Sequence, residues 1–256
     1  MSEALPKLEW RGVTKAFGDR KVLDGLNLSV APAESLVIIG ASGQGKSVSI
    51  KIAMGLIPAD AGAILVDGQD IGRLSARDRA GLYRRFGMLF QGSALFDSLS
   101  VWENVAFRLI NADGVRRKLA RERAIAALAR VRLGPETADL QPAELSGGMQ
   151  KRVALARAIV AEPEILIFDE PTTGLDPITA AAIDRLIIEQ VKGLGCTAVT
   201  ITHDLASARR IGDTIALLHN GRIIWRGPAA AIDDADDPYV AQFVAGRAEG
   251  PITAAI

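Results

Sequence analysis

The sequence predicts an α/β fold that combines a core of buried strands and helices, an antiparallel β subdomain and an inserted α-helical subdomain. Three observations predict it. The apolar run Leu36–Ile39 precedes a glycine-rich loop and a helical pattern, as expected for a buried parallel strand in an α/β sheet. Residues 8–13 and 26–30 alternate apolar and polar side chains, which indicates half-buried antiparallel strands. Residues 93–142 show helical spacing and no strand-like run.

Composition limits the functional classes. A chain of 256 residues fits a single α/β domain with an insertion. Lysine plus arginine and aspartate plus glutamate are equal at 30 each, so no basic field favours nucleic acid as a partner. The single cysteine, Cys196, excludes an internal disulfide and is expected to be a small buried side chain. No signal peptide or membrane-spanning run is found, which predicts a cytoplasmic protein that reaches a membrane only through a partner.

The N-terminal region is expected to form strands joined by turns. Phe17 precedes the turn signal Gly18-Asp19, where an aromatic ring could stack on a purine or could merely cap the sheet. Residues 63–66 form a further strand that ends at a turn, and Ser75 opens a charged helix that runs through residue 85 with a solvated face.

The loop of residues 40–47 is predicted to be a phosphate-binding P-loop. Its glycines let backbone N–H groups turn inward around an anion, and the following helix N-terminus adds positive charge. Lys46 can reach the β- and γ-phosphates, and the Ser47 hydroxyl can ligate Mg²⁺. The residues assigned here to nucleotide binding are Gly40, Ser42, Gly43, Gln44, Gly45, Lys46, Ser47 and Val48.

The next segments lead to a helical subdomain. Residues 86–90 form a buried strand that ends at Gln91, on the ligand side of an α/β sheet. Residues 101–109 and 115–133 then have helical spacing. The apolar stripe of the second helix is expected at Ile125, Leu128 and Val131, with its arginines facing solvent.

A second helix N-terminus that could meet an anion follows at residues 145–152. Ser146 is a good N-cap, Gly147 and Gly148 leave the backbone open, and Met149 begins an apolar helical face. The alternative is an ordinary helix cap. Its position downstream of a P-loop favours a second phosphate site.

Two carboxylates end the next buried strand, residues 164–170. Adjacent acids at a core strand end are costly unless they face a cation or a reacting group. Asp169 suits the Mg²⁺ shell, and Glu170 can orient and deprotonate a water for attack on the γ-phosphate. The alternative, a capping acid pair, is disfavoured by the upstream P-loop.

Residues 173–177 form a turn into an amphipathic helix, followed by a strand at residues 198–201. His203 follows that strand on the ligand side. A lone histidine is usually structural, but this position favours a γ-phosphate contact. His219, on a strand before the hairpin signal Asn220-Gly221, is given no functional role.

The order of these motifs resembles the ATP-binding cassette (ABC) ATPase family over nearly the whole chain. The resemblance implies a P-loop NTPase (RecA-like) core that binds ATP and Mg²⁺. It makes Phe17 the adenine-stacking aromatic, Gln91 the Q-loop residue that senses Mg²⁺ and the transport subunit, residues 146–148 the signature, and Asp176 part of the D-loop. Two ATP molecules would lie between head-to-tail subunits of a homodimer, each between one chain's P-loop and the other's signature.

The resemblance also implies a single ABC ATPase domain. Its nucleotide-binding core would take residues 1–91 and 157–227, its helical subdomain residues 92–156, and a C-terminal extension residues 228–256.

Within the family, residues 91–97, residues 101–107, the LSGGM signature and the tail segments 237–243 and 249–252 resemble ATPases of Mla-type lipid transporters. This implies a permease dimer that docks on residues 93–107, an MCE-domain protein, a small STAS-domain protein and a place on the cytoplasmic face of the inner membrane. Val48 departs from the hydroxyl residue common in the family, which puts one α-phosphate hydrogen bond in doubt, and Met149 replaces the common signature glutamine.

The sequence therefore predicts an Mg-ATP hydrolase that powers lipid transport. Glu170, His203 and Gln91 form the catalytic set, and Ser47, Gln91 and Asp169 hold the metal ion. An ABC transporter ATPase for another cargo is one alternative. A soluble remodelling ATPase is less favoured, because the chain has neither a second cassette nor a long coiled-coil insertion.

Overall fold

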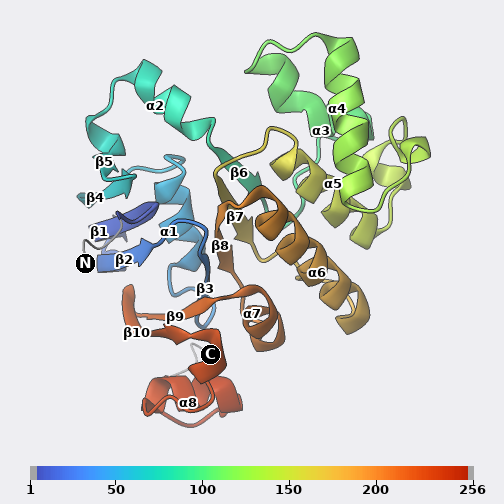
Figure 1. Cartoon of the computed structure of the whole chain (residues 1–256). Helices are drawn as coiled ribbons and strands as arrows, with labels where there is room; N and C mark the ends of the chain where they lie inside the picture. The colour runs from blue at the N-terminus through green and yellow to red at the C-terminus, as the bar shows by residue number, and fades with distance from the viewer. Residues whose placement is uncertain (1–4, 253–256) are drawn as a thin grey trace. The chain divides into compact units, whose positions relative to one another are not determined.

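The computed structural model describes residues 5–252 (Figure 1), and the chain divides into two structural units. The first unit contains residues 5–83 and 197–252, and the second contains Arg84–Cys196. Because the second unit is an internal segment, the chain leaves the first unit and returns to it. The expected domain boundaries at residues 91, 156 and 227 remain a prediction.

The antiparallel sheet of the first unit has the order β2-β1-β4-β5. Leu8 pairs with both Val30 and Val66, so β1 is the central strand of the three longer ones. Its buried residues Leu8 and Trp10 alternate with half-buried ones, as the sequence predicted, and the Trp10 indole donates to the Ser49 carbonyl at 3.0 Å. The strands are β1 (Leu8–Phe17), β2 (Arg20–Val30), β4 (Ala61–Val66) and β5 (Gln69–Asp70).

A second group of strands in this unit has the order β10-β9-β3-β8, with β3 parallel to both β8 and β9. Every residue of β3 is buried, which explains its unbroken apolar sequence. Ile38 lies opposite Ile201, so the segments that follow β3 and β8 leave from the same edge. These strands are β3 (Ser35–Ile39), β8 (Thr197–Ile201), β9 (Thr214–His219) and β10 (Arg222–Pro228).

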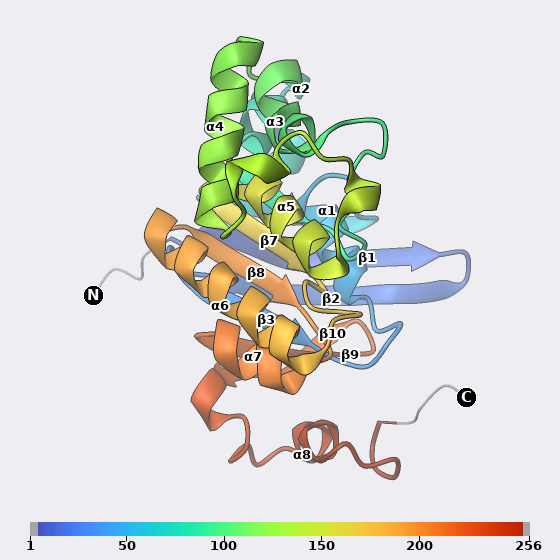
Figure 2. The same cartoon turned by 90° about the vertical axis from the view of Figure 1, so that its right-hand side faces the viewer.

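The helices of the first unit lie between its strands and at its C-terminal end, where the Gln242 side chain joins α8 to the following segment. Its amide donates to the Ile252 carbonyl at 2.9 Å and accepts from the Ile252 N–H at 2.6 Å. Figure 2 shows α8 followed by this returning segment. The helices are α1 (Lys46–Ala53), α2 (Ala76–Tyr83), α7 (Leu205–Ile211) and α8 (Pro238–Ala245).

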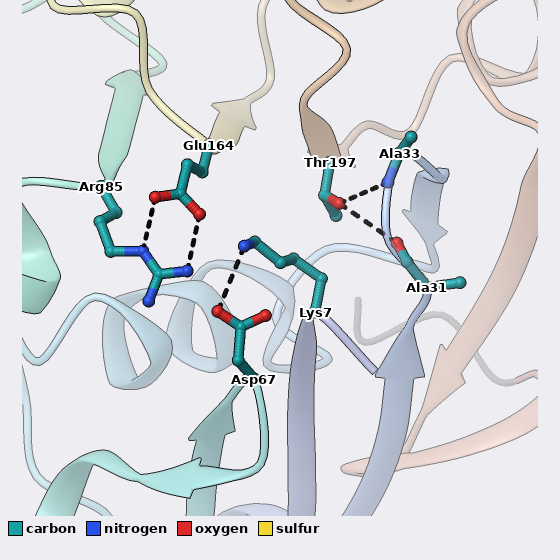
Figure 3. A network of polar contacts seen from close by, with 7 residues as sticks. All are labelled: Lys7, Ala31, Ala33, Asp67, Arg85, Glu164 and Thr197. Atoms are coloured by element: carbon teal, nitrogen blue, oxygen red, sulfur yellow. Dashed lines mark hydrogen bonds and ion pairs between the residues drawn. The ribbon is translucent and has the colours of Figure 1, made fainter. Parts of the chain in front are cut away.

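The second unit contains two parallel strands and four α-helices. Leu89 lies opposite Phe168, so the segments after β6 and β7 leave from one edge. Arg85 and Glu164 lie just before β6 and β7 begin, at the other edge of this strand pair. Figure 3 shows the Arg85 guanidinium donating to the Glu164 carboxylate, through contacts of 2.9 and 2.6 Å. The elements are β6 (Phe86–Leu89), α3 (Val101–Asn111), α4 (Arg117–Arg130), α5 (Gly147–Ile159), β7 (Ile165–Asp169) and α6 (Pro177–Leu194).

Figure 3 also shows three contacts inside the first unit that hold its strand ends in place. Lys7 pairs with Asp67 at 3.2 Å beside β1 and β4. The Thr197 hydroxyl accepts from the Ala33 N–H at 2.9 Å and donates to the Ala31 carbonyl at 3.2 Å, so the start of β8 is fixed to the turn before β3.

Two helices differ from expectation. In α4 the fully buried positions include Ala120, Ala124 and Leu128, whereas Ile125 is only half-buried. The helix packs closely through alanines because α3 and α5 both contact it, and it stops at Arg130 because Arg132 turns left-handed, with φ of 60°. The charged helix α2 ends at Tyr83 rather than residue 85. Within residues 5–252, no helix is long and apolar enough to cross a membrane.

Candidate functional site

The P-loop joins β3 to α1 in the first unit, and close backbone approach explains two of its glycines. A Cβ on Gly40 would lie 2.4 Å from the Leu218 carbonyl oxygen, and one on Gly45 would lie 2.7 Å from the Val22 carbonyl oxygen. Gly45 also has φ of 99°, which side chains rarely permit. The two glycines therefore let the loop pack directly against neighbouring backbone.

Lys46 is the first residue of α1 and is only 7% exposed. Its ammonium donates to the Gly40 carbonyl at 2.7 Å and to the Ala41 carbonyl at 3.0 Å, so the charge lies across the loop. No acidic residue lies in the first turn of α1. The helix N-terminus therefore keeps its positive character, which suits a phosphate.

Other side chains secure the loop from outside. The Gln44 amide oxygen accepts from the Asn220 N–H at 2.6 Å, which fixes the loop to the β9–β10 turn. Arg20 donates to the Gly43 carbonyl at 3.2 Å. The Gln44 side chain thus has a structural partner, and a phosphate contact at this residue would come from its backbone.

Two further predicted residues belong to this unit. Phe17 ends β1 with 52% of its surface exposed, and the Lys15 ammonium lies 5.5 Å from its ring centroid. The ring is therefore accessible for stacking. His203 is exposed just after β8, and it leaves from the same strand edge as the P-loop. Ser47 and Val48 are half-buried in the first turn of α1.

The second unit supplies the predicted carboxylates. Asp169 ends β7, and Asp169 and Glu170 are 5% and 8% exposed. Glu170 has φ of 50°, an uncommon conformation for a residue with a side chain, and its carboxylate accepts from the Thr173 hydroxyl at 2.7 Å. Such backbone strain is typical of functional positions.

Gln91 is exposed after β6, at the strand edge that it shares with these carboxylates. Its carbonyl accepts from the ammonium of Lys151, a residue that is 5% exposed. Burial lowers the pKa of Lys151, while the charges of Glu170 and Asp169 oppose that shift. The buried Lys151 ammonium therefore contacts the Gln91 carbonyl and interacts with the charges of Asp169 and Glu170.

The signature and the predicted D-loop line one cavity of about 650 Å³ in the second unit. Ser146 caps α5 by accepting from the Met149 N–H at 3.3 Å, and Gly147 and Gly148 form the first turn. Asp176 caps α6, and its hydrogen bond from the Thr179 hydroxyl holds its pKa below the usual range. Arg132, which is ion-paired with Glu189 at 2.7 Å, and Arg152 also line the cavity, so a helix N-terminus, two cations and the Asp176 carboxylate share one space.

The side chains that could ligate a metal can be compared with the ligands that Mg²⁺ prefers. Within residues 5–252 no group of three or more His, Cys, Asp or Glu forms a self-contained metal cage. Mg²⁺ prefers few protein oxygens together with substrate phosphates. The Ser47 hydroxyl in the first unit and the Asp169 carboxylate in the second are each an oxygen ligand of this kind.

Sequence reasoning missed Lys151, Arg157 and Asn104, all of which hold the loop after β6. A signal existed for the first of these. Lys151 lies four residues before Leu155, a buried residue of the same helix, so it shares an apolar face where a lysine is unexpected.

A phosphate loop, a strand-end carboxylate pair and a capped signature helix define a P-loop nucleoside triphosphatase. Residues 23–173 match the ABC transporter family, and the chain belongs to that family as an ATP-binding, ATP-hydrolysing subunit.

Similar proteins include the intermembrane phospholipid transport ATP-binding protein MlaF of Haemophilus influenzae, which is 38% identical over 96% of this chain and 92% of its own. The probable ribonucleotide transport ATP-binding protein mkl of Mycobacterium tuberculosis is 37% identical over 96% of this chain and 68% of its own. A solved dimeric ATP-binding cassette, in a post-hydrolysis state bound to ADP and Pi, is 31% identical with a TM-score of 0.78, covering 87% of this chain and 98% of its own. The expected cassette fold is thereby confirmed.

Proposed function

We propose that this chain powers phospholipid transport between membranes, as the ATPase of an MCE-associated permease. The observation that supports phospholipid as the cargo is the 38% identity to MlaF, whose match extends over 96% of this chain. The cassette itself offers no basis for choosing a lipid, because an ABC ATPase binds nucleotide and its permease binds cargo.

In the proposed reaction, Lys46 and the P-loop backbone neutralise phosphate charge while Ser47 and Asp169 hold Mg²⁺. That ion, when bound with ATP, offsets negative charge on the β- and γ-phosphate oxygens. Glu170 accepts a proton from water as the water oxygen bonds to the γ-phosphorus. The bond between the γ-phosphorus and the β-phosphate oxygen breaks, and ADP leaves.

The remaining predicted residues complete this proposal. His203 and Gln91 contact the γ-phosphate, Gln91 also approaches the metal ion, and Phe17 stacks on adenine. We place the signature and Asp176 of one chain against ATP held by the P-loop of a second copy. The capped N-terminus of α5 and the cavity that it shares with the D-loop support this head-to-tail homodimer.

The permease would dock on residues 93–107. Phe96 and Phe107 support this surface, because they are 43% and 38% exposed and their ring centroids lie 4.5 Å apart. Exposed aromatic pairs are typical anchors of protein interfaces. The ATPase would thereby be held at the cytoplasmic face of the inner membrane, with an MCE-domain protein and a STAS-domain protein as further partners.

The test is to purify the tagged chain from membranes in mild detergent and identify the proteins and lipids that accompany it. We expect a permease, an MCE-domain protein and phospholipid. A permease with a soluble solute-binding protein would contradict the lipid cargo and favour another substrate, such as a ribonucleotide. Recovery only in the soluble fraction would contradict the transport role.

A surface variant sharpens this experiment. Phe96→Ser should remove the permease from the purified sample while ATP hydrolysis by the isolated chain persists. Leu119→Ser, on α4, is the matched control because Leu119 is 44% exposed and lies outside the proposed docking segment. Equal recovery of permease with both variants would contradict docking through Phe96.

A further inference from the structure

The loop that follows β6 adopts a conformation that its own residues do not favour. Ser93 and Ala94 have φ of 62° and 48°, a left-handed region in which glycine is usual. Neither residue is glycine, and Ser93 is only 3% exposed. Consecutive strained residues persist only where surrounding contacts over-determine them. The loop must therefore be held from outside.

Two cations on the signature helix α5 hold it. The Lys151 ammonium donates to the Gln91 carbonyl. The Arg157 guanidinium donates to the Ser93 carbonyl at 2.6 Å and to the Ala94 carbonyl at 2.7 Å. Hydrogen bonds from charged donors are roughly twice as strong as neutral ones. The two side chains thus fix both ends of the segment from Gln91 to Ala94.

Burial makes these contacts more consequential. Lys151 is 5% exposed, and burial lowers the pKa of Arg157 below its usual value. A cation removed from water is stable only with well-placed acceptors. The carbonyls of the loop are such acceptors, so displacement of the loop would leave the buried Lys151 ammonium and the half-buried Arg157 guanidinium without these acceptors. The loop and α5 are therefore expected to move together.

The same loop continues into the segment proposed to dock the permease. Asn104 of α3 is fully buried; it accepts from the Phe96 N–H at 2.7 Å and donates to the Leu99 carbonyl at 2.9 Å. Phe96 lies two residues after Ala94, so the backbone connects this anchored segment directly to the loop that Lys151 and Arg157 of α5 hold.

We propose that Lys151 and Arg157 are positioning residues that clamp the Gln91–Ala94 loop to the signature helix. This inference rests on the proposed roles of Gln91 and of the docking segment. The clamp sets where the Gln91 side chain lies relative to the Asp169–Glu170 strand end, and it transmits displacement of the docking segment to the signature. Neither cation is required to touch ATP.

The central experiment measures kcat and KM for ATP with the full chain, alone and in its permease complex. Lys151→Met removes the donor but keeps the length of the side chain. We expect kcat to fall about 10- to 100-fold, the scale of a misplaced catalytic group, while KM changes less than about twofold. Lys151→Arg restores a donor and should recover most of kcat. Lys118→Met, at an exposed position of α4, is the matched control.

A double-variant cycle separates positioning from a merely structural role. If Lys151 acts through Gln91, Lys151→Met should add little to the loss already caused by Gln91→Ala. Additive losses, or a Lys151→Met variant indistinguishable from Lys118→Met, would overturn the inference. Should Lys151→Met not fold, Arg157→Lys provides a milder change, because one ammonium cannot reproduce both guanidinium contacts, and the same cycle applies.

The two proposals fail in different ways. Hydrolysis by the wild-type chain without any response to the permease would contradict the transport role, yet the cycle between Lys151 and Gln91 would still decide the clamp. Conversely, normal permease stimulation in Lys151→Met would overturn the clamp and leave the transport role intact.

Discussion

Asn104 provides the most direct measure of what holds the docking segment in place. Its side chain is fully buried and bonds to the backbone of the preceding loop. It accepts from the Phe96 N–H at 2.7 Å, and its amide donates toward the Phe96, Leu99 and Ser100 carbonyls at 3.0, 2.9 and 3.2 Å. Asn104→Ala would remove all of these contacts at once.

The magnitude follows from this count. One carbonyl oxygen and two N–H groups give the equivalent of about three hydrogen bonds, each worth about 1 kcal/mol net. The variant should therefore lose about 3 kcal/mol of unfolding free energy. With an m-value of about 2 kcal/mol/M in urea, the midpoint should fall by about 1.5 M.

Urea denaturation followed by tryptophan fluorescence is a suitable assay, because Trp102 lies on the same helix and is the one tryptophan of the second unit. Asn111→Ala is the matched control: it removes an exposed asparagine side chain of α3 that donates one hydrogen bond, to the Phe107 carbonyl at 2.8 Å. We expect the control to change stability by less than about 0.5 kcal/mol. A midpoint shift for Asn104→Ala no larger than that of the control would refute the reasoning.

Three further predictions follow from the site and its surroundings. Glu170→Gln should keep ATP binding, lower turnover by about 10²- to 10⁴-fold and trap the closed dimer. Nucleotide binding, phosphate release and gel filtration measure these three effects. Near-normal hydrolysis would remove Glu170 from its proposed role. Lys46→Met should abolish nucleotide binding in a fluorescent-ATP assay without unfolding the chain, and retained affinity would place the phosphates elsewhere. Burial raises the pKa of Cys196 to about 11 from 9.0. As pH rises, the unfolded state loses the thiol proton before the folded state does. The free energy of unfolding should therefore be unaffected below pH 9 and fall by about 2 to 3 kcal/mol as pH rises to 11. Cys196→Ala should lack this loss in pH-dependent denaturation.

Most of the fold could be predicted because its signals are local. The apolar run of β3, the alternation of β1 and the Asn220-Gly221 turn each carry one dominant physical cause, and the structure contains all three. The buried face of α4 was harder to predict. Its packing surface consists largely of alanines, which carry a weak hydrophobic pattern, so Ile125 drew the expected stripe away from Ala124.

The candidate site shows the same division. Glycines at residues 40 and 45 and acids at residues 169 and 170 occur in a recognisable order, so sequence alone suggests a phosphate site. The assignments of these residues to ATP and Mg²⁺ stay predictions. The contacts of Lys151 with the Gln91 carbonyl could not be predicted, because a backbone acceptor 60 residues away has no sequence pattern of its own.

The left-handed residues after β6 give this division a functional meaning. Had glycine occupied positions 93 and 94, the loop could adopt its conformation without help, and its geometry would be independent of α5. With Ser93 and Ala94 there, the conformation depends on Arg157, whose guanidinium holds both carbonyls. Strain in one segment is thus compensated by charge on another. The conformation of the loop therefore depends on the position of the signature helix. A segment that couples two sites needs this dependence.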